Sequence, residues 1–498
     1  MGSSTTSPRQ RDLDTDVVVV GAGMAGWTAA RRSQEAGLRV VVVDKGDAPG
    51  ACNARVSQGF LNAAYLGMRE DPVVLQAYAR EITSGSAREP LLDAWSRNCS
   101  RAVDWLVIQG VDVGTLPEKQ DRLYIRPFRV SPQGLRDIDP ERGPARCITQ
   151  HSRRFADAGG TLLVRSPATE LLTTREGGVA GVVVQGPQGE RRVASAAVVL
   201  ADGGFQGNAD MLRQHVGPAA DRMKLRSLST QTGDGIRMAQ ALGAATAGMQ
   251  YFYGHMLSLD AMTNDDLWPY PLMDGAICDG ILVRRDGRRF LDEQMCGAGM
   301  SRRAMSGIGV ANAVGQSADP RGTVAVLDSA GWALKGWDKD RGEFQGTYPA
   351  NPTIQERGGR VHQAEDLSEL ARLAGIDPQQ LARTVEEYNA AVRAGTFAAL
   401  PVPRSGDPQL VEVGPFFAIP CVAGITYTLG GLLVTPHGEV ESADGGVIPG
   451  LFAAGGTMGG LAGGPLGGYT GGLGEAVVFG LLAAERIADL ARRRGGPR

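Results

Sequence analysis

The sequence predicts an α/β protein with two domains, and three observations support this prediction. The 498 residues exceed the length at which one hydrophobic core stops growing. Residues 16–46 contain an apolar strand, a glycine turn, a helix and a second apolar strand, which is the pattern of a parallel βαβ unit. Residues 251–427 differ in character, with tryptophans, tyrosines and a helix pair, and this change indicates an inserted second domain.

The composition is that of an ordinary soluble protein. Apolar residues make up 43%, charged residues make up 21%, and the net charge is −3, which argues against nucleic acid or an anionic membrane as an obligatory partner. The six cysteines form no CxxC pair, so we expect neither a metal site nor a disulfide framework, and we expect a cytoplasmic location. No apolar run is long enough to span a bilayer, and residues 1–12 are expected to form a disordered tail.

The βαβ unit "DVVVVGAGMAGWTAARRSQEAGLRVVVVDKG" carries the glycine pattern of a dinucleotide site. Gly21 permits the tight turn, Gly23 lets a pyrophosphate approach the backbone, and Gly26 lets the helix pack on the strand. The N-terminus of the helix then faces the phosphates. Asp44 ends the second strand, where an acidic side chain is expected to bind the ribose hydroxyls. We therefore predict a bound dinucleotide.

Four further stretches resemble, in the same order, the fumarate reductase and succinate dehydrogenase flavoprotein family. They are "GACNARVSQGFLNAA" (50–64), "VVLADGGFQGN" (198–208), "QTGDGIRMAQALGA" (231–244) and "VIPGLFAAGGTMGG" (447–460). The resemblance implies a Rossmann-like FAD-binding domain of the glutathione-reductase type with an inserted α+β cap domain. The membrane-bound members attach the flavin covalently to a histidine, and Asn53 takes that position here, which implies non-covalent FAD.

The resemblance also implies domain boundaries and cofactor contacts. The FAD-binding domain is expected at 13–250 and 428–498, and the cap domain at 251–427. The residues expected to contact FAD are Gly21, Ala22, Gly23, Met24, Ala25, Gly26, Asp44, Lys45, Cys52, Asn53, Ala54, Ser57, Gln58, Gly59, Ala168, Ala201, Asp202, Gly203, Asp234, Gly455, Gly456, Gly472 and Leu473.

The final helix has a physical argument of its own. The stretch "GGLGEAVVFGLLAAERIADLARRR" begins after glycines and ends in arginines, which suit the negative end of the helix dipole. In the family its N-terminus points at the pyrimidine side of the flavin. Backbone N–H groups near Gly472 and Leu473 are therefore implied to stabilise the negative charge of reduced FAD.

The cap domain is expected to complete the substrate site. The stretch "DLSELARLAGIDPQQLARTVEEYNAAV" resembles the helix pair of the family's cap. A cap that closes on a flavin excludes water, so reactive side chains are expected at its two hinges. His255 lies at one hinge and Tyr427 at the other.

The sequence argues against fumarate and succinate as substrates. The soluble fumarate reductases have a proton-donating arginine after "NRFMNE", and in the matching run "RRFLDEQMCGAG" that position falls at Gly297. Tyr427 in "TYTLGG" replaces the hinge histidine of "HHTMGG", and residues 457–475 contain no lysine, arginine or histidine to supply the clamping arginine. Only His255 matches a family histidine. We therefore expect a cavity of tyrosine and glycine without a carboxylate clamp.

This pattern resembles the branch of ketosteroid dehydrogenases, tricarballylate dehydrogenases and related cyclic-ketone desaturases. Their final loop carries a tyrosine followed by glycines, as "GYTGGLGEA" does with Tyr469. The resemblance implies an FAD-dependent dehydrogenase that forms a C=C bond beside the carbonyl of a cyclic ketone or a polycarboxylate. The spacing from Tyr469 to the helix is shorter than in ketosteroid dehydrogenases, so steroid specificity is not carried over.

Desaturation needs a base for the α-proton, donors for the enolate oxygen and flavin N5 for the β-hydride. Tyr427 is the first candidate base, if dipoles or cations lower its pKa from about 10. Tyr469 and the N–H groups of the glycine loop are candidates for the carbonyl oxygen, and His255 for relaying the proton. Plain packing is the alternative for each of them. Weaker candidates are Tyr251, Tyr253 and Tyr270, with Arg126 and Arg129 for a substrate carboxylate.

Two other classes of function remain open. The same residues suit an enone or enoate reductase that uses reduced FAD. A non-catalytic flavin-binding redox subunit is the third possibility, and it predicts a cap without polar groups facing N5. No CxxCH haem site is present, so electrons must pass to an external acceptor such as oxygen, a quinone or a redox protein.

Overall fold

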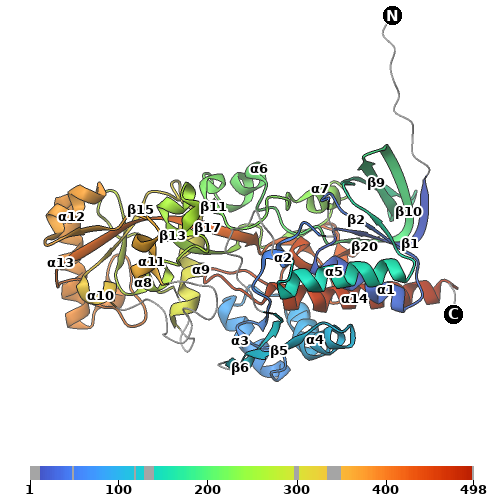
Figure 1. Cartoon of the computed structure of the whole chain (residues 1–498), viewed down its shortest axis with the longest axis horizontal. Helices are drawn as coiled ribbons and strands as arrows, with labels where there is room; N and C mark the ends of the chain where they lie inside the picture. Colours follow the sequence, from blue (N-terminus) through green and yellow to red (C-terminus); the bar gives the residue numbers. More distant parts are fainter. Residues whose placement is uncertain are drawn as a thin grey trace, which may run out of the picture.

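The computed structural model describes residues 12–47, 50–116, 119–127, 140–295, 302–333 and 349–495. All but the last residue of the predicted tail lies outside these ranges. The architecture is the predicted α/β one, with an FAD-domain sheet at one end of the molecule and a cap sheet at the other (Figure 1). Within the described ranges, no helix is both long and apolar enough to cross a lipid bilayer.

The FAD-domain sheet has the order β19-β20-β10-β1-β2-β7, with β8 and β9 added beside β10. Its strands are β1 (Leu13–Val20), β2 (Val40–Val43), β7 (Thr161–Leu163), β8 (Ala168–Thr173), β9 (Val179–Gly186), β10 (Gly189–Leu200), β19 (Glu439–Glu441) and β20 (Val447–Ala453). The strands β20, β10, β1, β2 and β7 run parallel. The second half of β1 and all of β2 consist of buried valines, as expected for parallel strands that are covered on both faces.

Helices cover this sheet, and the glycine turn at Gly21 and Gly23 connects β1 to the first of them. Helix α1 packs between α14 and α5, and α4 packs on α14 from the other side (Figure 1). The helices of this domain are α1 (Met24–Glu35), α2 (Asn53–Val56), α3 (Pro72–Ile82), α4 (Glu89–Ile108), α5 (Gly143–Asp157), α6 (Ala209–Met211), α7 (Asp234–Gln240) and α14 (Gly472–Arg493).

Two smaller sheets stand beside these helices. One has the order β4-β3-β6-β5 and the other β12-β18-β21. Their strands are β3 (Phe60–Ala63), β4 (Leu66–Gly67), β5 (Val113–Leu116), β6 (Lys119–Ile125), β12 (Thr246–Ala247), β18 (Gly431–Leu433) and β21 (Met458–Gly459).

The cap sheet is organised around β17, a thirteen-residue strand. It pairs with β11, β13, β15 and β16, and β14 extends the sheet beyond β15. The strands are β11 (Lys224–Leu225), β13 (Phe252–Ser258), β14 (Ile281–Arg284), β15 (Thr323–Leu327), β16 (His362–Ala364) and β17 (Phe416–Thr428). Strand β11 precedes residue 250 but joins this sheet, because Lys224 and Leu225 pair in parallel with β17. The domain boundaries at 250 and 428 stay predictions.

The predicted helix pair of the cap is present as α12 and α13. Asp366 caps α12 by accepting from the N–H of Glu369, and Asp377 caps α13 in the same way. Gly375 ends α12 in the left-handed conformation. The cap helices are α8 (Asp274–Cys278), α9 (Arg302–Gly315), α10 (Ser329–Ala333), α11 (Ala350–Glu356), α12 (Leu367–Ala374) and α13 (Pro378–Ala394).

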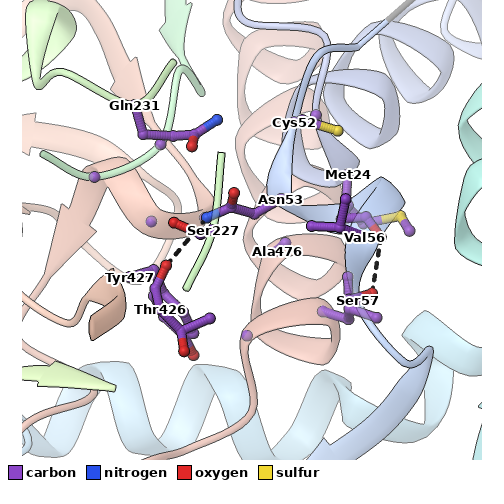
Figure 2. Close-up of a pocket in the computed structure, with 18 of the residues that line it drawn as sticks. Met24, Cys52, Asn53, Val56, Ser57, Ser227, Gln231, Thr426, Tyr427 and Ala476 are labelled. Atoms are coloured by element: carbon purple, nitrogen blue, oxygen red, sulfur yellow. Dashed lines mark hydrogen bonds between the residues drawn. The ribbon is translucent and has the colours of Figure 1, made fainter. Parts of the chain in front are cut away.

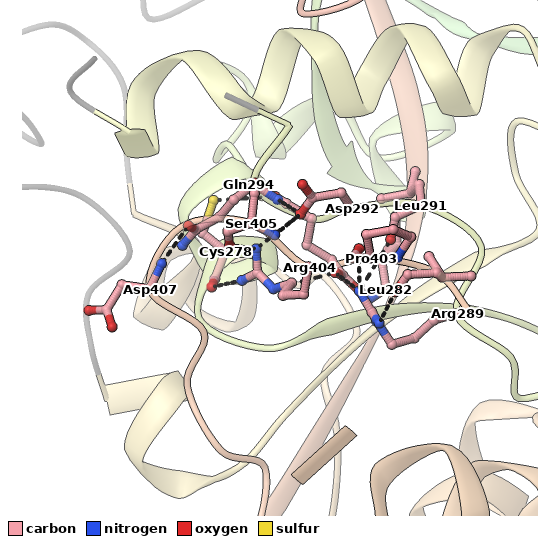
Figure 3. Close-up of polar contacts among 12 residues, drawn as sticks. Cys278, Leu282, Arg289, Leu291, Asp292, Gln294, Pro403, Arg404, Ser405 and Asp407 are labelled. Atoms are coloured by element: carbon pink, nitrogen blue, oxygen red, sulfur yellow. Dashed lines mark hydrogen bonds and ion pairs between the residues drawn. The ribbon is translucent and has the colours of Figure 1, made fainter. Parts of the chain in front are cut away.

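A buried ionic network ties the cap together around Glu293. Figure 3 labels its partners Leu282, Arg289 and Arg404. Its carboxylate accepts from Arg289 at 2.6 Å and from the N–H of Leu282 at 3.0 Å. Arg404 lies 3.5 Å from the same carboxylate and donates to the carbonyl of Cys278 at 2.7 Å. The side chains of Glu293 and Arg404 are both 0% exposed. The network therefore holds the segment around Arg404 against β14 and α8.

We expect Glu293→Gln to destabilise the cap strongly. The substitution leaves two buried guanidinium groups opposite a neutral amide, and removing one partner of a buried ion pair costs about 3–5 kcal/mol. Urea unfolding followed by tryptophan fluorescence measures the loss. Asp104→Asn is the matched control, because it breaks the exposed Arg69–Asp104 pair and should cost less than about 1 kcal/mol. Equal stability of the two variants would contradict the role given to Glu293.

Candidate functional site

One large cavity, about 410 Å³, lies where the glycine turns meet the end of β17. Met24, Cys52 and Ser57 border one side of it, and Thr426 and Tyr427 border the other (Figure 2). Every residue predicted to contact FAD lines this cavity except Gly26. Gly26 packs against the turn instead, since a Cβ there would lie 1.9 Å from the carbonyl oxygen of Gly21.

The turn before α1 fits a pyrophosphate. Gly21 has a φ of +102°, and a Cβ there would lie 2.4 Å from the carbonyl oxygen of Ala201, so only glycine fits. At Gly23 a Cβ would meet only the Cβ of Cys52, at 3.6 Å, so the backbone is open to the cavity. Helix α1 has no side-chain cap and no acidic residue in its first turn. Its N-terminal N–H groups are therefore available for phosphate oxygens.

Acidic side chains order the neighbouring loops. The Asp44 carboxylate accepts from the N–H of Ala22 at 2.7 Å and of Gly46 at 2.6 Å. Asp234 forms an ion pair with Lys45, with 2.7 Å between Oδ2 and Nζ. Burial raises the pKa of Asp202 to about 6, although the N–H of Gly235 opposes this shift. These contacts hold the loops at the dinucleotide end of the cavity in place.

The N-terminus of α14 reaches the same cavity. Gly472 and Leu473 line it, and the helix has no side-chain cap. Burial raises the pKa of Glu475, in the first turn, to about 7, and the Thr470 hydroxyl opposes the shift. Asn53 bridges the two sides of the cavity, because its amide donates to the carbonyl of Thr426 at 3.3 Å. An amide provides no nucleophile for covalent flavin attachment, so these residues fit non-covalent FAD.

Four tyrosines lie close together at the end of the cavity away from the Asp44 and Asp234 loops. The ring of Tyr253 lies 4.5 Å from that of Tyr469 and 5.5 Å from that of Tyr427, between centroids. Tyr65 packs edge-on against Tyr469 at 5.3 Å. All four line the cavity. The structure thus brings the predicted Tyr427 and Tyr469 together with Tyr253, a weaker candidate, and with Tyr65, which the sequence reasoning missed.

The pairing of β13 with β17 places these side chains. Tyr253 lies opposite Tyr427, and His255 lies opposite Gly424. His255 Nδ1 is 2.5 Å from Asp274 Oδ2, and His255 Nε2 is 3.1 Å from the hydroxyl of Tyr253. Asp274 is 1% exposed and also accepts from the N–H of Met256. A continuous chain of hydrogen bonds therefore runs from Asp274 through His255 to Tyr253 at the cavity.

The tyrosine pKa values differ from the expectation for Tyr427. Burial raises the pKa of Tyr427 well above its usual value, and the neighbouring Tyr469 and Glu475 add to the shift. Burial also raises the pKa of Tyr469. The condition under which Tyr427 would act as the base, a lowered pKa, is therefore not met. Burial raises the pKa of Tyr253 as well, but there the Arg226 guanidinium works in the opposite direction.

The cavity that the sequence predicts to be lined by tyrosine and glycine is lined by arginines as well. Three arginines line the cavity: Arg122, Arg142 and Arg226. None of them lies in the 457–475 loop, where the family has its clamping arginine. The tertiary fold brings Arg226 in from the end of β11. Arg126 is not at the cavity, because it pairs with Asp112 on the surface at 2.6 Å.

The other sequence candidates divide between the cavity and its surroundings. Tyr270 lines the cavity, whereas Tyr251 packs near Gly463 and does not border it. Arg129 and Gly297 lie outside the described residues. Asp274, a partner of His255, carried no sequence signal beyond an acid at the start of a short helix.

We expect Gly23→Ala to weaken FAD binding without harming the fold. Its φ of −83° suits alanine and the new Cβ has only ordinary contacts, so the lost space is that left for the cofactor. The dissociation constant for FAD should rise about tenfold or more, measured by flavin absorbance during equilibrium dialysis. Gly21→Ala is the contrast, because it should also lower the melting temperature of the apoprotein. Unchanged FAD affinity in Gly23→Ala would contradict this assignment.

Comparison with known proteins agrees with this site. The chain matches the family model described as "FAD binding domain" over residues 16–470. It is 27% identical to "Fumarate reductase (cytochrome)" of Shewanella frigidimarina over 488 residues, which cover 96% of this chain and 78% of the relative. It is 26% identical to "3-oxosteroid 1-dehydrogenase" of Mycobacterium tuberculosis over 585 residues, which cover 96% and 99% of the two chains.

The fold is shared with solved structures. The 3-ketosteroid Δ1-dehydrogenase from Sterolibacterium denitrificans superposes with a TM-score of 0.71 at 19% identity, covering 96% of this chain and 100% of that chain. The expected resemblance to fumarate reductase flavoproteins and ketosteroid dehydrogenases is thereby confirmed, and so are the α/β fold and the FAD cofactor. The chain belongs to the FAD binding domain family and is an FAD-dependent oxidoreductase that acts on CH–CH groups.

Proposed function

We propose that the protein is a dehydrogenase that forms a C=C bond beside the carbonyl of a cyclic ketone or a polycarboxylate. The observation that carries this proposal is the hydrogen-bond chain Asp274–His255–Tyr253, which ends at the cavity that the FAD motifs line. Bound FAD supplies the acceptor for the two electrons that leave with the β-hydrogen. The similarity to a 3-oxosteroid 1-dehydrogenase supports the same chemistry.

Tyr253 is the group that removes the α-proton in this proposal. The short contact with Asp274 favours the tautomer of His255 that carries its proton on Nδ1, which leaves Nε2 as an acceptor. The hydroxyl of Tyr253 donates to Nε2. As Tyr253 takes the α-proton, its own proton passes to His255. The electrons of the broken α C–H bond form the C=C bond while the β-hydrogen leaves with its electron pair.

Tyr427 and Tyr469 bind the carbonyl oxygen in this proposal. Their raised pKa values keep both hydroxyls protonated, which suits a donor and opposes a base. The Tyr427 hydroxyl is buried, and among the described residues it meets no partner in hydrogen-bonding geometry. It lies beside Gly472 at the N-terminus of α14, where the N–H of Gly472 donates to the Tyr469 hydroxyl at 3.4 Å. A substrate carbonyl gives Tyr427 the missing acceptor and gains stabilisation as an enolate forms.

The reverse reaction is the second candidate. Reduction of an enone or enoate uses the same side chains, and the similarity to a fumarate reductase favours it. In either direction electrons are exchanged with an external partner such as oxygen, a quinone or a redox protein. A cytoplasmic location is part of this proposal. The polar chain at the cavity argues against the non-catalytic alternative.

Anaerobic mixing tests the proposal. The oxidised protein should lose its flavin absorbance on mixing with a saturated cyclic ketone or a tricarboxylate, because the substrate's two electrons pass to FAD. A panel of both compound classes is screened by stopped-flow absorbance. If no compound bleaches the flavin, but an enone reoxidises the dithionite-reduced protein, the reductase replaces the dehydrogenase.

Phenylalanine substitutions separate the proposed roles. Tyr253→Phe removes the base and should slow flavin reduction by about 10²–10⁴-fold. Tyr427→Phe removes one donor to the developing oxyanion and should slow it by about 10²–10³-fold. Tyr388→Phe is the control, since this tyrosine is buried in the cap core with its hydroxyl on the carbonyl of Gln409, away from the cavity. A Tyr253→Phe rate equal to that of Tyr388→Phe would remove Tyr253 from the mechanism.

A further inference from the structure

Arg226 is held at the tyrosine end of the cavity by the cap sheet. Its backbone N–H donates to the carbonyl of Ile425 at 2.8 Å, which extends the pairing of β11 with β17. The stem of the side chain lies over Gly424, where a Cβ would approach Arg226 Cδ to 2.7 Å. The absence of a side chain at residue 424 therefore makes room for a guanidinium beside the cavity.

The guanidinium of Arg226 has no ion-pair partner in the part of the chain that the structure describes. Nη1 donates to the Thr426 hydroxyl at 3.0 Å, while Nε is buried and meets no described hydrogen-bond partner. Among the described side chains, no carboxylate forms an ion pair with Arg226. Asp274 is the acid that acts on Arg226 through space, and its two oxygens are already bound to His255 and the N–H of Met256. Burial lowers the pKa of Arg226, yet arginine stays charged in proteins.

The surroundings of Arg226 place it with the substrate and not with the dinucleotide. The groups that act on its charge are Tyr253, Asp274 and Tyr270, all at the cap end of the cavity. Lys45, at the dinucleotide end, is paired with Asp234, and Arg122 and Arg142 have partners of their own. Burying a cation without a neighbouring anion costs free energy, and an anion bound from outside the chain would offset this cost.

We infer that Arg226 binds a carboxylate of the substrate, so that the substrate is a carbonyl compound that also carries one carboxylate. The identity of the reacting carbonyl rests on the proposed function, whereas the carboxylate contact does not. Arginine suits this contact because its planar group donates two parallel hydrogen bonds to a carboxylate. The neutral hydroxyls of Tyr427 and Tyr469 remain for the carbonyl oxygen. The single guanidinium of Arg226 matches one carboxylate.

Ligand binding to the oxidised holoprotein tests the inference without turnover. The probes are benzoate and benzamide, which share their shape, differ in charge, and have no hydrogen that the enzyme can remove beside a carbonyl. Binding is followed by perturbation of the flavin absorbance. We expect benzoate to bind at least about tenfold more tightly than benzamide, since hydrogen bonds to charged groups exceed those to neutral ones.

Substitutions at Arg226 show whether this side chain causes the preference. Arg226→Gln should abolish the preference for benzoate while leaving benzamide affinity within about twofold, and Arg226→Lys should retain part of it. Arg222→Gln is the matched control, because Arg222 is an exposed arginine paired with Asp319. It should keep the full preference. The flavin spectrum of each variant reports whether the holoprotein is intact.

The outcomes separate this inference from the proposed function. Equal binding of benzoate and benzamide to the unsubstituted protein, or a preference that survives in Arg226→Gln, overturns the carboxylate contact and leaves the dehydrogenase to the bleaching experiment. A preference that depends on Arg226, found in a protein that no ketone bleaches, supports the contact and removes the dehydrogenase. If Arg226→Gln does not bind FAD, a lower preference in Arg226→Lys supports the contact and an unchanged one overturns it.

Discussion

The antiparallel pairing of β13 with β17 is the constraint on which the rest of the site depends. Strand β17 lies at the centre of the cap sheet, and its C-terminal end borders the cavity. The register sets Tyr253 opposite Tyr427 and His255 opposite Gly424. A slip of one residue would turn every side chain of a strand to the other face of the sheet. The same ladder therefore brings the tyrosines together, points His255 at Asp274, and leaves the space that Arg226 fills.

Burial raises the pKa values of Tyr253, Tyr427 and Tyr469 alike, but the three side chains have different partners. At Tyr427 the neighbouring Tyr469 and Glu475 reinforce the effect of burial, and at Tyr469 it is Tyr253 and Glu475 that do so. Tyr253 instead has His255 as an acceptor for its proton and Arg226 to favour its anion. Titratable groups whose surroundings act in opposite directions within one cavity are suited to opposite roles. In the proposed function, this difference in surroundings makes Tyr253 the base and makes Tyr427 and Tyr469 the donors to the oxyanion, although all three are tyrosines.

Local backbone patterns were readable in the sequence, and contacts between distant segments were not. The βαβ unit and the helix pair were predicted, and all but one of the predicted FAD contacts line the cavity, because glycine spacing and helix caps act within a few residues. The roles of Tyr253, Asp274 and Arg226 depend on how β11, β13 and α8 meet around β17, which no spacing encodes. Tyr427 was placed at the cavity correctly, but burial raises its pKa, so the lowered pKa that a tyrosinate base requires is absent there.

The position of Arg226 bears on how one fold can bind different substrates. A dianion such as fumarate needs cationic groups at both ends, and the family places them in the hinge and the final loop. This chain has tyrosine and glycine in those places, and it has an arginine directly after β11, the short parallel neighbour of β17. The side chain of Arg226 packs over Gly424, where a Cβ would be too close to it. The position of the arginine therefore depends on a glycine in the cap sheet. In the proposed function the cation therefore lies at the cap sheet and not in the loops around the flavin, close to the hydrogen-bond chain that links β13 to Asp274 on α8.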